Sequence, residues 1–132
     1  MSSTDPAGAA RRLMGMAVGG AVVAAGLALS AAGDGTPVLG VCLGHQLVAV
    51  AFGGEVVPNP LGQQIGVLGV GWTQAAHDDP LFAPLAAIGP DVPAVQWNND
   101  IVSRLPDEAV DLAHTPRGEV QAARFAPSVW GV

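Results

Sequence analysis

The chain has 132 residues, half of them hydrophobic, which is enough for one domain with a buried core and too few for two. Its formal net charge is −6, and its five basic residues are all arginines scattered along the chain, so we expect no nucleic-acid partner. The single cysteine, Cys42, excludes an internal disulfide and a C-x-x-C zinc site. No metal or other cofactor is predicted.

The first 35 residues contain an uncharged stretch rich in alanine and glycine. Residues 13–32 follow the pair Arg11-Arg12 and end in small residues, a pattern typical of export signals. Alanine and glycine insert into lipid less readily than leucine, and Ala21 to Ala32 has the length of a crossover helix that ends at Gly33. We therefore expect this helix to pack on the sheet of a cytoplasmic protein, while an export role for residues 13–32 stays open.

A strand followed directly by a helix is predicted around the cysteine. "TPVLGVC" (residues 36–42) is a short valine-containing run, typical of a strand buried on both faces in a parallel sheet. "GHQLVAVAFGG" (residues 44–54) has helical spacing, with Leu47, Val50 and Ala51 on one face and Gly53-Gly54 as its end. Cys42 is thus placed at a strand-to-helix turn.

The rest of the chain alternates short apolar runs with turns. "EVVPNPLGQQIGVLGVGWT" predicts a loop and then an extended strand, and "HDDPLFAPLAAIG" predicts a turn and a short helix capped by Asp79. Four further strands are expected, at Val95 to Trp97, Val110 to Ala113, Val120 to Phe125, and from Val129 onward.

The glycines around the cysteine form the pattern G-x-C-x-G, typical of a nucleophile elbow. Small residues at Gly40 and Gly44 allow a sharp, strained turn that exposes the Cys42 side chain, and larger residues are expected to clash there. The start of the helix favours thiolate over thiol, and the backbone N–H of Leu43 is placed to stabilise an oxyanion. Glycine is common in this chain, so it is the position between strand and helix that favours a reactive thiol over an inert one.

The segment "PVLGVCLGHQLVAVAFGGEV" resembles the nucleophile segment of class I glutamine amidotransferases, whose pattern is G-V-C-x-G-x-Q. "QQIGVLGVGWT" with "DDPLF", and "WNNDIVSRLPDEAVDLAHTPRGEVQAARF", are similar to the branch that includes GMP synthase glutaminase domains. The resemblance covers residues 37–132. It implies a three-layer α/β fold with a mostly parallel, flavodoxin-like sheet, incomplete at both ends, and a short antiparallel extension near the C-terminus. We therefore expect a poorly matched segment, 1–20, and a partial amidotransferase domain, 21–132.

The resemblance also implies a reaction. Cys42 would attack the side-chain amide of glutamine to give a glutamyl thioester, and the ammonia released would pass to a synthase domain or subunit. Leu43 matches the residue whose backbone N–H binds the oxyanion. Gln46 matches the family glutamine that holds the substrate, with Gly40 and Gly44 beside it. The implied partners are glutamine and a synthase, and no membrane is expected.

Three features depart from the family pattern. Trp97-Asn98-Asn99-Asp100 stands where many relatives read W-H-x-D, so an amide takes the place of a histidine. The family's second oxyanion donor lies in a glycine-rich loop, for which Gly19-Gly20 is the only candidate. The family's catalytic histidine and glutamate lie in a Q-F-H-P-E motif directly after a W-G-V strand, and these 132 residues end at "VWGV".

None of the other titratable residues is expected to replace the missing base. We assign His45 a packing or surface role and expect His77 and His114 to be exposed. The acid pairs Asp78-Asp79 and Asp107-Glu108 are expected to cap helices or to be solvated. Three hypotheses remain: an amidotransferase domain that is inactive in these residues alone, a non-catalytic binding or regulatory remnant, and a related cysteine hydrolase of the same α/β superfamily.

Overall fold

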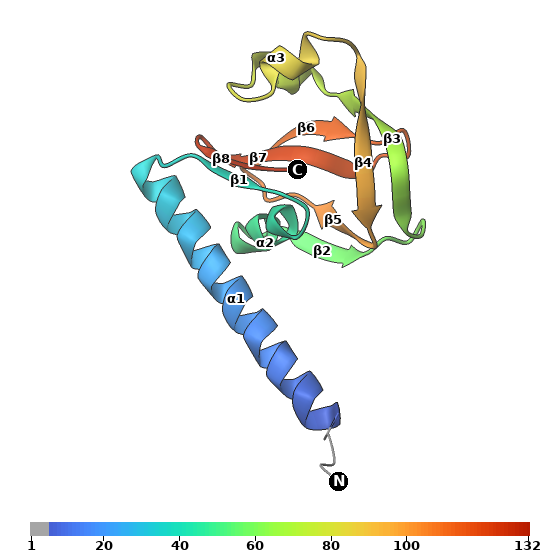
Figure 1. Ribbon diagram of the computed structural model, residues 1–132. Coiled ribbons are helices and arrows are strands. Elements are labelled where there is room, and N and C mark those ends of the chain that lie inside the picture. The colour runs from blue at the N-terminus through green and yellow to red at the C-terminus, as the bar shows by residue number, and fades with distance from the viewer. Residues whose placement is uncertain (1–5) are drawn as a thin grey trace.

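The computed structural model describes the backbone of residues 6–132 and side chains from Gly19 onward (Figure 1). Its elements follow in the order α1 (Pro6–Asp34), β1 (Val38–Gly40), α2 (Leu43–Ala51), β2 (Glu55–Pro58), β3 (Gln64–Trp72), the 3-10 helix η1 (Gln74–Asp78), α3 (Ala83–Ala86), β4 (Asp91–Asn98), β5 (Asp100–Arg104), β6 (Val110–His114), β7 (Val120–Ala126) and β8 (Val129–Gly131).

Six strands form a mixed sheet in the order β1-β8-β7-β6-β3-β4, and β2 pairs with β5 in a separate two-stranded sheet. Between the described residues, β1 and β8 form the only parallel pair, in which Val38 lies opposite Val129. All other pairs are antiparallel. The antiparallel extension that the sequence predicts as short therefore makes up most of the described sheet.

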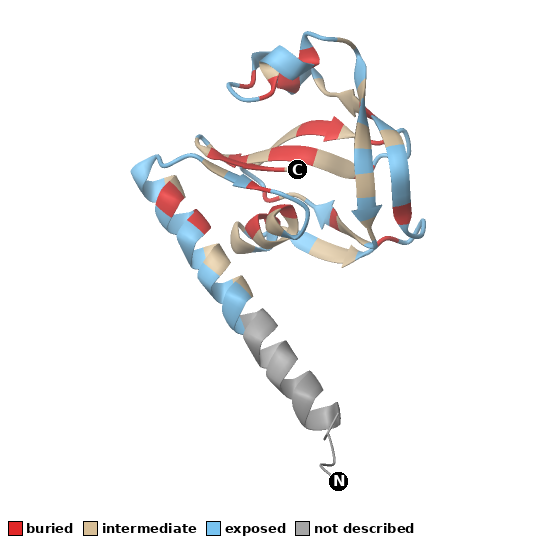
Figure 2. Ribbon diagram, viewed as in Figure 1, coloured by how far each residue is buried: buried red, intermediate tan, exposed pale blue. Residues whose placement is uncertain are grey.

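The core lies on both faces of the sheet, as a three-layer arrangement requires. Neighbouring residues of one strand point to opposite faces, so Ala122 joins Phe82 and Ala86 beside η1 and α3, whereas Ala123 joins Val48 beside α2. Figure 2 shows that the buried residues gather on α2 and on the central strands β6, β7 and β8, while much of β3 and β4 is exposed.

Two details of the predicted strand and helix around Cys42 differ from the structure. The buried residues of α2 are His45, Val48 and Ala49, so the face through Leu47, Val50 and Ala51 is not the one that packs on the sheet. The side chain of Leu39 is 50% exposed, because β1 is an edge strand with β8 as its single neighbour in the described sheet. Beyond this region, the strands β2 and β5 of the structure were not predicted from the sequence.

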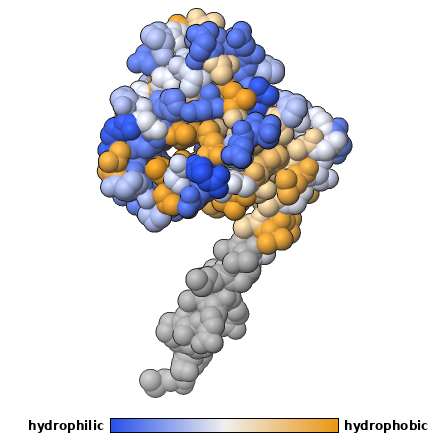
Figure 3. Space-filling model, turned by 180° about the vertical axis from the view of Figure 1, so that it is seen from behind, coloured by the Kyte–Doolittle hydropathy of each residue, from blue (hydrophilic) through white to orange (hydrophobic). Residues whose placement is uncertain are grey.

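Helix α1 runs without a break across residue 20, so the division at that position stays a prediction. Ala28 and Ala31 are buried at its C-terminal end, and Ala28 packs with Val48 of α2 and Val129 of β8. The predicted helix is therefore present, but it contacts α2 as well as the sheet. Figure 3 shows hydrophobic residues at the surface where α1 joins the rest of the molecule.

None of the helices in residues 6–132 is both long and apolar enough to cross a membrane. The alternative that residues 13–32 act as an export signal stays a prediction.

Asp79 connects η1 and α3 to the sheet. Its buried carboxylate accepts hydrogen bonds from the backbone N–H groups of Leu81 and Phe82, so it caps the turn that leads into α3, whose own N-cap residue is Phe82. It also accepts from Nε of Arg124 at 2.9 Å and from Nε1 of Trp130 at 3.1 Å. This partly buried ion pair and the Trp130 hydrogen bond join the helical layer to β7 and β8.

Candidate active site

Cys42 lies at the turn between β1 and α2 in a strained backbone conformation. Its φ of 54° and ψ of −109° make it the only non-glycine residue with positive φ in residues 6–132. Such a conformation costs about 1–3 kcal/mol and persists only where the surroundings impose it. Here Val132 imposes it, because the amide of Cys42 donates to the Val132 carbonyl at 2.7 Å and the amide of Val132 donates to the Gly40 carbonyl at 2.9 Å. The Cys42 side chain is exposed, as expected for a nucleophile elbow.

The two glycines that flank the cysteine differ in how closely they are packed. A Cβ at Gly40 would lie 2.5 Å from the Gly44 carbonyl oxygen and 2.9 Å from the His45 amide nitrogen. A Cβ at Gly44 would meet nothing within 4 Å. The predicted clash is therefore found at Gly40 and is wrong at Gly44, because Gly44 faces an apolar groove between α1 and α2.

The polar groups expected near the thiol come from the first turn of α2. Leu43 is the first residue of that helix, so its backbone N–H has no carbonyl of the same helix to bind. Gln46 lies one turn further along, and its Nε2 donates to the backbone carbonyl of Asp100 at 3.1 Å. Gly19-Gly20 lies inside α1 instead of in a glycine-rich loop, so the prediction of a second oxyanion donor there is wrong. The alanine-rich sequence around these glycines favours helix.

A cavity of about 280 Å³ opens beside the thiol. Cys42, His45 and Gln46 line it from the turn and α2, and β4 and β5 contribute Asn98 and Asp100 among its other walls. Its volume is close to the lower end of small-molecule sites, about 300 Å³. The arrangement places an exposed thiol, a helix N-terminus and a side-chain amide at one side of a space whose other walls are mostly apolar, among them Trp72, Phe82 and Val102.

The three histidines lie in different surroundings. His45 is 6% exposed and its ring lies 5.7 Å from that of Phe125, which confirms the packing role. His77 is exposed on η1, as expected. The side chain of His114 is 38% exposed and pairs through Nε2 with Asp111, so His114 is partly exposed. Asp78, Asp107 and Glu108 are exposed, as predicted for solvated acids.

Burial of His45 predicts a loss of stability in mild acid. Burial lowers the pKa of His45 from 6.5 to about 4. Between pH 6.5 and pH 4, His45 is therefore protonated in the unfolded chain and neutral in the folded chain. The free energy of unfolding should therefore fall as the pH drops from 6.5 toward 4, by about 3 kcal/mol in total. Urea unfolding across this range measures the effect. The variant His45→Leu cannot titrate there, and an unchanged pH slope in that variant would assign the loss to other groups.

One set of residues near the site was not predicted from the sequence. Nδ2 of Asn98 donates to Oε1 of Gln64 at 2.8 Å and to the backbone carbonyl of Asp100 at 3.2 Å, and this carbonyl is the one that Gln46 binds. The departure from W-H-x-D pointed to Asn98. Nothing in the sequence pattern pointed to Gln64, whose partner lies 34 residues away.

Comparison with known proteins identifies the family. The profile described as "Glutamine amidotransferase class-I" matches residues 15–132. The chain belongs to the class I glutamine amidotransferase family. The chain is 36% identical over 88 residues to a glutamine-hydrolyzing GMP synthase subunit of Methanococcoides burtonii, a match that covers 67% of this chain and 43% of that protein. It is 34% identical over 97 residues to the protein of the same name in Methanosarcina mazei, covering 73% of this chain and 48% of the relative.

Solved structures agree with this amidotransferase assignment. A putative GMP synthase subunit from Thermoplasma acidophilum has a TM-score of 0.62 and 26% identity, over 73% of this chain and 45% of its own. A glutamine amidotransferase from Thermotoga maritima, 24% identical, shares the fold with a TM-score of 0.71 over 82% of this chain and 44% of its own. The α/β fold class and the family resemblance are thus confirmed. The amidotransferase chain spans somewhat less than half the length of these relatives.

Proposed function

We propose that this chain carries the nucleophile of a glutamine amidotransferase. The Cys42 thiolate adds to the side-chain amide carbon of glutamine, the C–N bond breaks, and ammonia leaves with a proton while a glutamyl thioester forms. Water then attacks the thioester, which releases glutamate and restores the thiol. The observation that carries this proposal is the strained, exposed Cys42 at the start of α2, beside a cavity of amino-acid size.

The neighbouring groups have distinct roles in this proposal. The backbone N–H of Leu43 stabilises the oxyanion that develops during addition, where one such donor is worth about 3 kcal/mol. Gln46 holds the substrate through its side-chain amide. Gly40 shapes the turn beside the substrate by leaving room for the first turn of α2, whereas no such packing constraint applies at Gly44.

The departing ammonia takes its proton from the imidazolium that forms when a histidine accepts the thiol proton, and no histidine of the described residues suits this exchange. His77 and His114 lie on η1 and β6, and the buried His45 is held neutral at pH 7 because burial lowers its pKa to about 4. We therefore propose that the 132 residues alone do not turn glutamine over. We further propose that the ammonia is consumed by a synthase domain or subunit in the cytoplasm. The archaeal relatives, which are named as glutamine-hydrolyzing subunits of GMP synthase, support such a partner.

Selective labelling of Cys42 tests the substrate class. A chloroketone analogue of glutamine should alkylate Cys42 much faster than it alkylates a free thiol peptide, because the cavity orients the reagent at the thiol. L-Glutamine should slow this labelling and L-asparagine, one methylene shorter, should not. The Cys42→Ser variant is the control and should take up no label. Labelling no faster than that of the peptide would contradict the proposal.

A further inference from the structure

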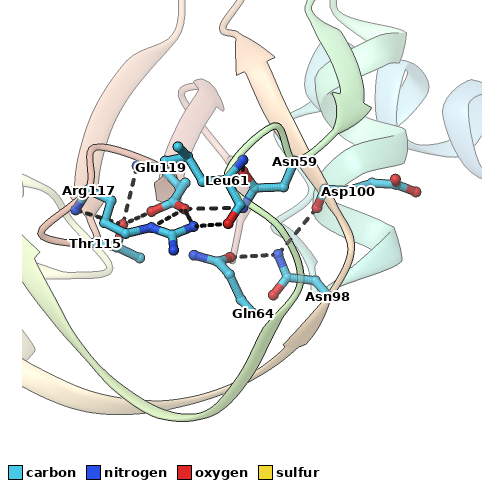
Figure 4. Close-up of polar contacts among 8 residues, drawn as sticks. All are labelled: Asn59, Leu61, Gln64, Asn98, Asp100, Thr115, Arg117 and Glu119. Carbon is cyan, nitrogen blue, oxygen red and sulfur yellow. Dashed lines mark hydrogen bonds and ion pairs between the residues drawn. The ribbon is translucent and has the colours of Figure 1, made fainter.

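Gln64 is joined through Asn98 to Asp100 by hydrogen bonds (Figure 4), and the Asp100 carbonyl in turn binds Gln46 beside Cys42. Its side chain is buried, 4% exposed, at the first position of β3. Its Oε1 accepts from Nδ2 of Asn98 at 2.8 Å, and the same nitrogen donates to the Asp100 carbonyl at 3.2 Å. That carbonyl also accepts from Nε2 of Gln46 at 3.1 Å. The Asp100 carbonyl thus binds the amides of Gln46 and Asn98, and Asn98 also binds the amide of Gln64.

This arrangement fixes which end of each amide faces which partner. An amide group donates from its nitrogen and accepts at its oxygen, so a flipped Asn98 would set its oxygen against the oxygens of Gln64 and Asp100. With both N–H groups of Asn98 engaged, its Oδ1 is buried without a partner among the described residues. Gln46 likewise donates its nitrogen to Asp100, which leaves its Oε1 to accept from a bound molecule.

We propose that Gln64 is a positioning residue for the amidotransferase reaction. Acting through Asn98 and the Asp100 carbonyl, it sets the orientation in which Gln46 meets a small amino acid that brings N–H donors into the cavity. This inference rests on the proposed function, because it concerns the substrate held beside Cys42. The positioning role requires an oxygen at position 64 that accepts the hydrogen bond from Asn98. A residue of similar volume that lacks this oxygen should not hold Asn98 in place.

A second polar cluster in Figure 4 provides a matched control. Nδ2 of the buried Asn59 donates to Oε1 of Glu119, which also accepts from Arg117 at 2.7 Å. Burial raises the pKa of Glu119, but the hydrogen bonds from Thr115, Arg117 and Asn59 outweigh it and lower the pKa to about 2. In the described residues, no side-chain hydrogen bond joins this cluster to Gln64 or Asn98. Losing the Asn59 amide should therefore lower stability without altering the Cys42 site.

The test compares two rates of Cys42 alkylation, one with the glutamine chloroketone and one with iodoacetamide, in each variant. Gln64→Leu should lower the ratio of these rates roughly tenfold and leave the iodoacetamide rate unchanged. Gln64→Glu keeps an oxygen acceptor and should restore the ratio to within about threefold of wild type. Asn59→Leu should lower the melting temperature and keep the wild-type ratio. If Gln64→Leu does not fold, Asn98→Leu at a half-buried position removes the same hydrogen bond and should give the same loss.

The outcomes separate the inference from the proposed function. A wild-type ratio in the Gln64→Leu variant, or in Asn98→Leu where that variant stands in for it, would overturn the positioning role. So would a Gln64→Glu variant as impaired as Gln64→Leu, since a merely structural loss would not be rescued by the acceptor alone. A wild-type protein whose ratio equals that of a free thiol peptide would overturn the proposed function itself, and the inference with it.

Discussion

Replacing Gly40 by alanine is expected to destroy the turn at Cys42. The added Cβ would lie 2.5 Å from the carbonyl oxygen and 2.6 Å from the carbonyl carbon of Gly44, and both atoms belong to the backbone of the first turn of α2. Backbone atoms in a helix cannot move aside as a flexible side chain can. The free energy of unfolding should therefore fall by about 3 kcal/mol, a large part of the stability of a small domain. Selective labelling of Cys42 should be lost with it.

The matched variant Gly44→Ala should behave in the opposite way. A Cβ at this position meets nothing within 4 Å, and alanine favours helix over glycine by about 1 kcal/mol. Stability should therefore stay the same or rise slightly, and Cys42 should stay reactive. Urea unfolding of both variants, together with their alkylation rates, measures the contrast. A Gly44→Ala variant as unstable as Gly40→Ala would mean that the turn needs glycine flexibility at both positions, against the difference in packing between them.

The elements that the sequence predicted correctly are those fixed by local chemistry. The strand-to-helix turn at Cys42, the Asp79 cap and the short helix after it follow from glycine, proline and aspartate at positions with few alternatives. The buried face of α2 could not be predicted in the same way, because Val48 and Ala49 are no more apolar than Val50 and Ala51. Which of them is buried depends on where α1, β7 and β8 lie.

The residues of the candidate site likewise fall into those placed by a local motif and those brought together by the fold. Cys42, Leu43 and Gln46 lie within five consecutive residues, so one motif could place them together. Gln64, Asn98 and the Asp100 carbonyl reach the site from β3, β4 and β5, and their meeting depends on antiparallel pairing in which Gln64 lies opposite Asn98. The strand β5 was not predicted, so the carbonyl that binds Gln46 could not have been found from the sequence.

The second large effect expected is on catalysis. In a cysteine–histidine pair the imidazole holds the thiolate and later gives a proton to the departing amine. The described residues supply the thiol, the helix N-terminus and a backbone N–H, but the histidine that lines the same cavity, His45, is a weak base because burial lowers its pKa to about 4. Loss of one member of such a catalytic set lowers the rate by several orders of magnitude. A protein of these 132 residues should therefore release essentially no ammonia from glutamine.

A chimera should recover this activity. It would carry the present residues together with the N- and C-terminal parts of a relative such as the Methanococcoides burtonii protein that lie outside the match, where the family pattern predicts the Q-F-H-P-E histidine. The histidine would then follow β8, whose end is hydrogen-bonded to the Cys42 turn through Val132. Glutaminase turnover should rise by several orders of magnitude over the 132-residue protein, because the thiolate regains its base.

The sharpest test of Cys42 as the glutamine nucleophile is therefore ammonia release from L-glutamine by this chimera and by its Cys42→Ala variant. We expect turnover in the chimera, none above background in Cys42→Ala, and none in the 132-residue protein. Equal ammonia release from the chimera and its Cys42→Ala variant would show that another residue attacks the amide. Release from the 132-residue protein that disappears in its own Cys42→Ala variant would show that one of the three described histidines acts as the base.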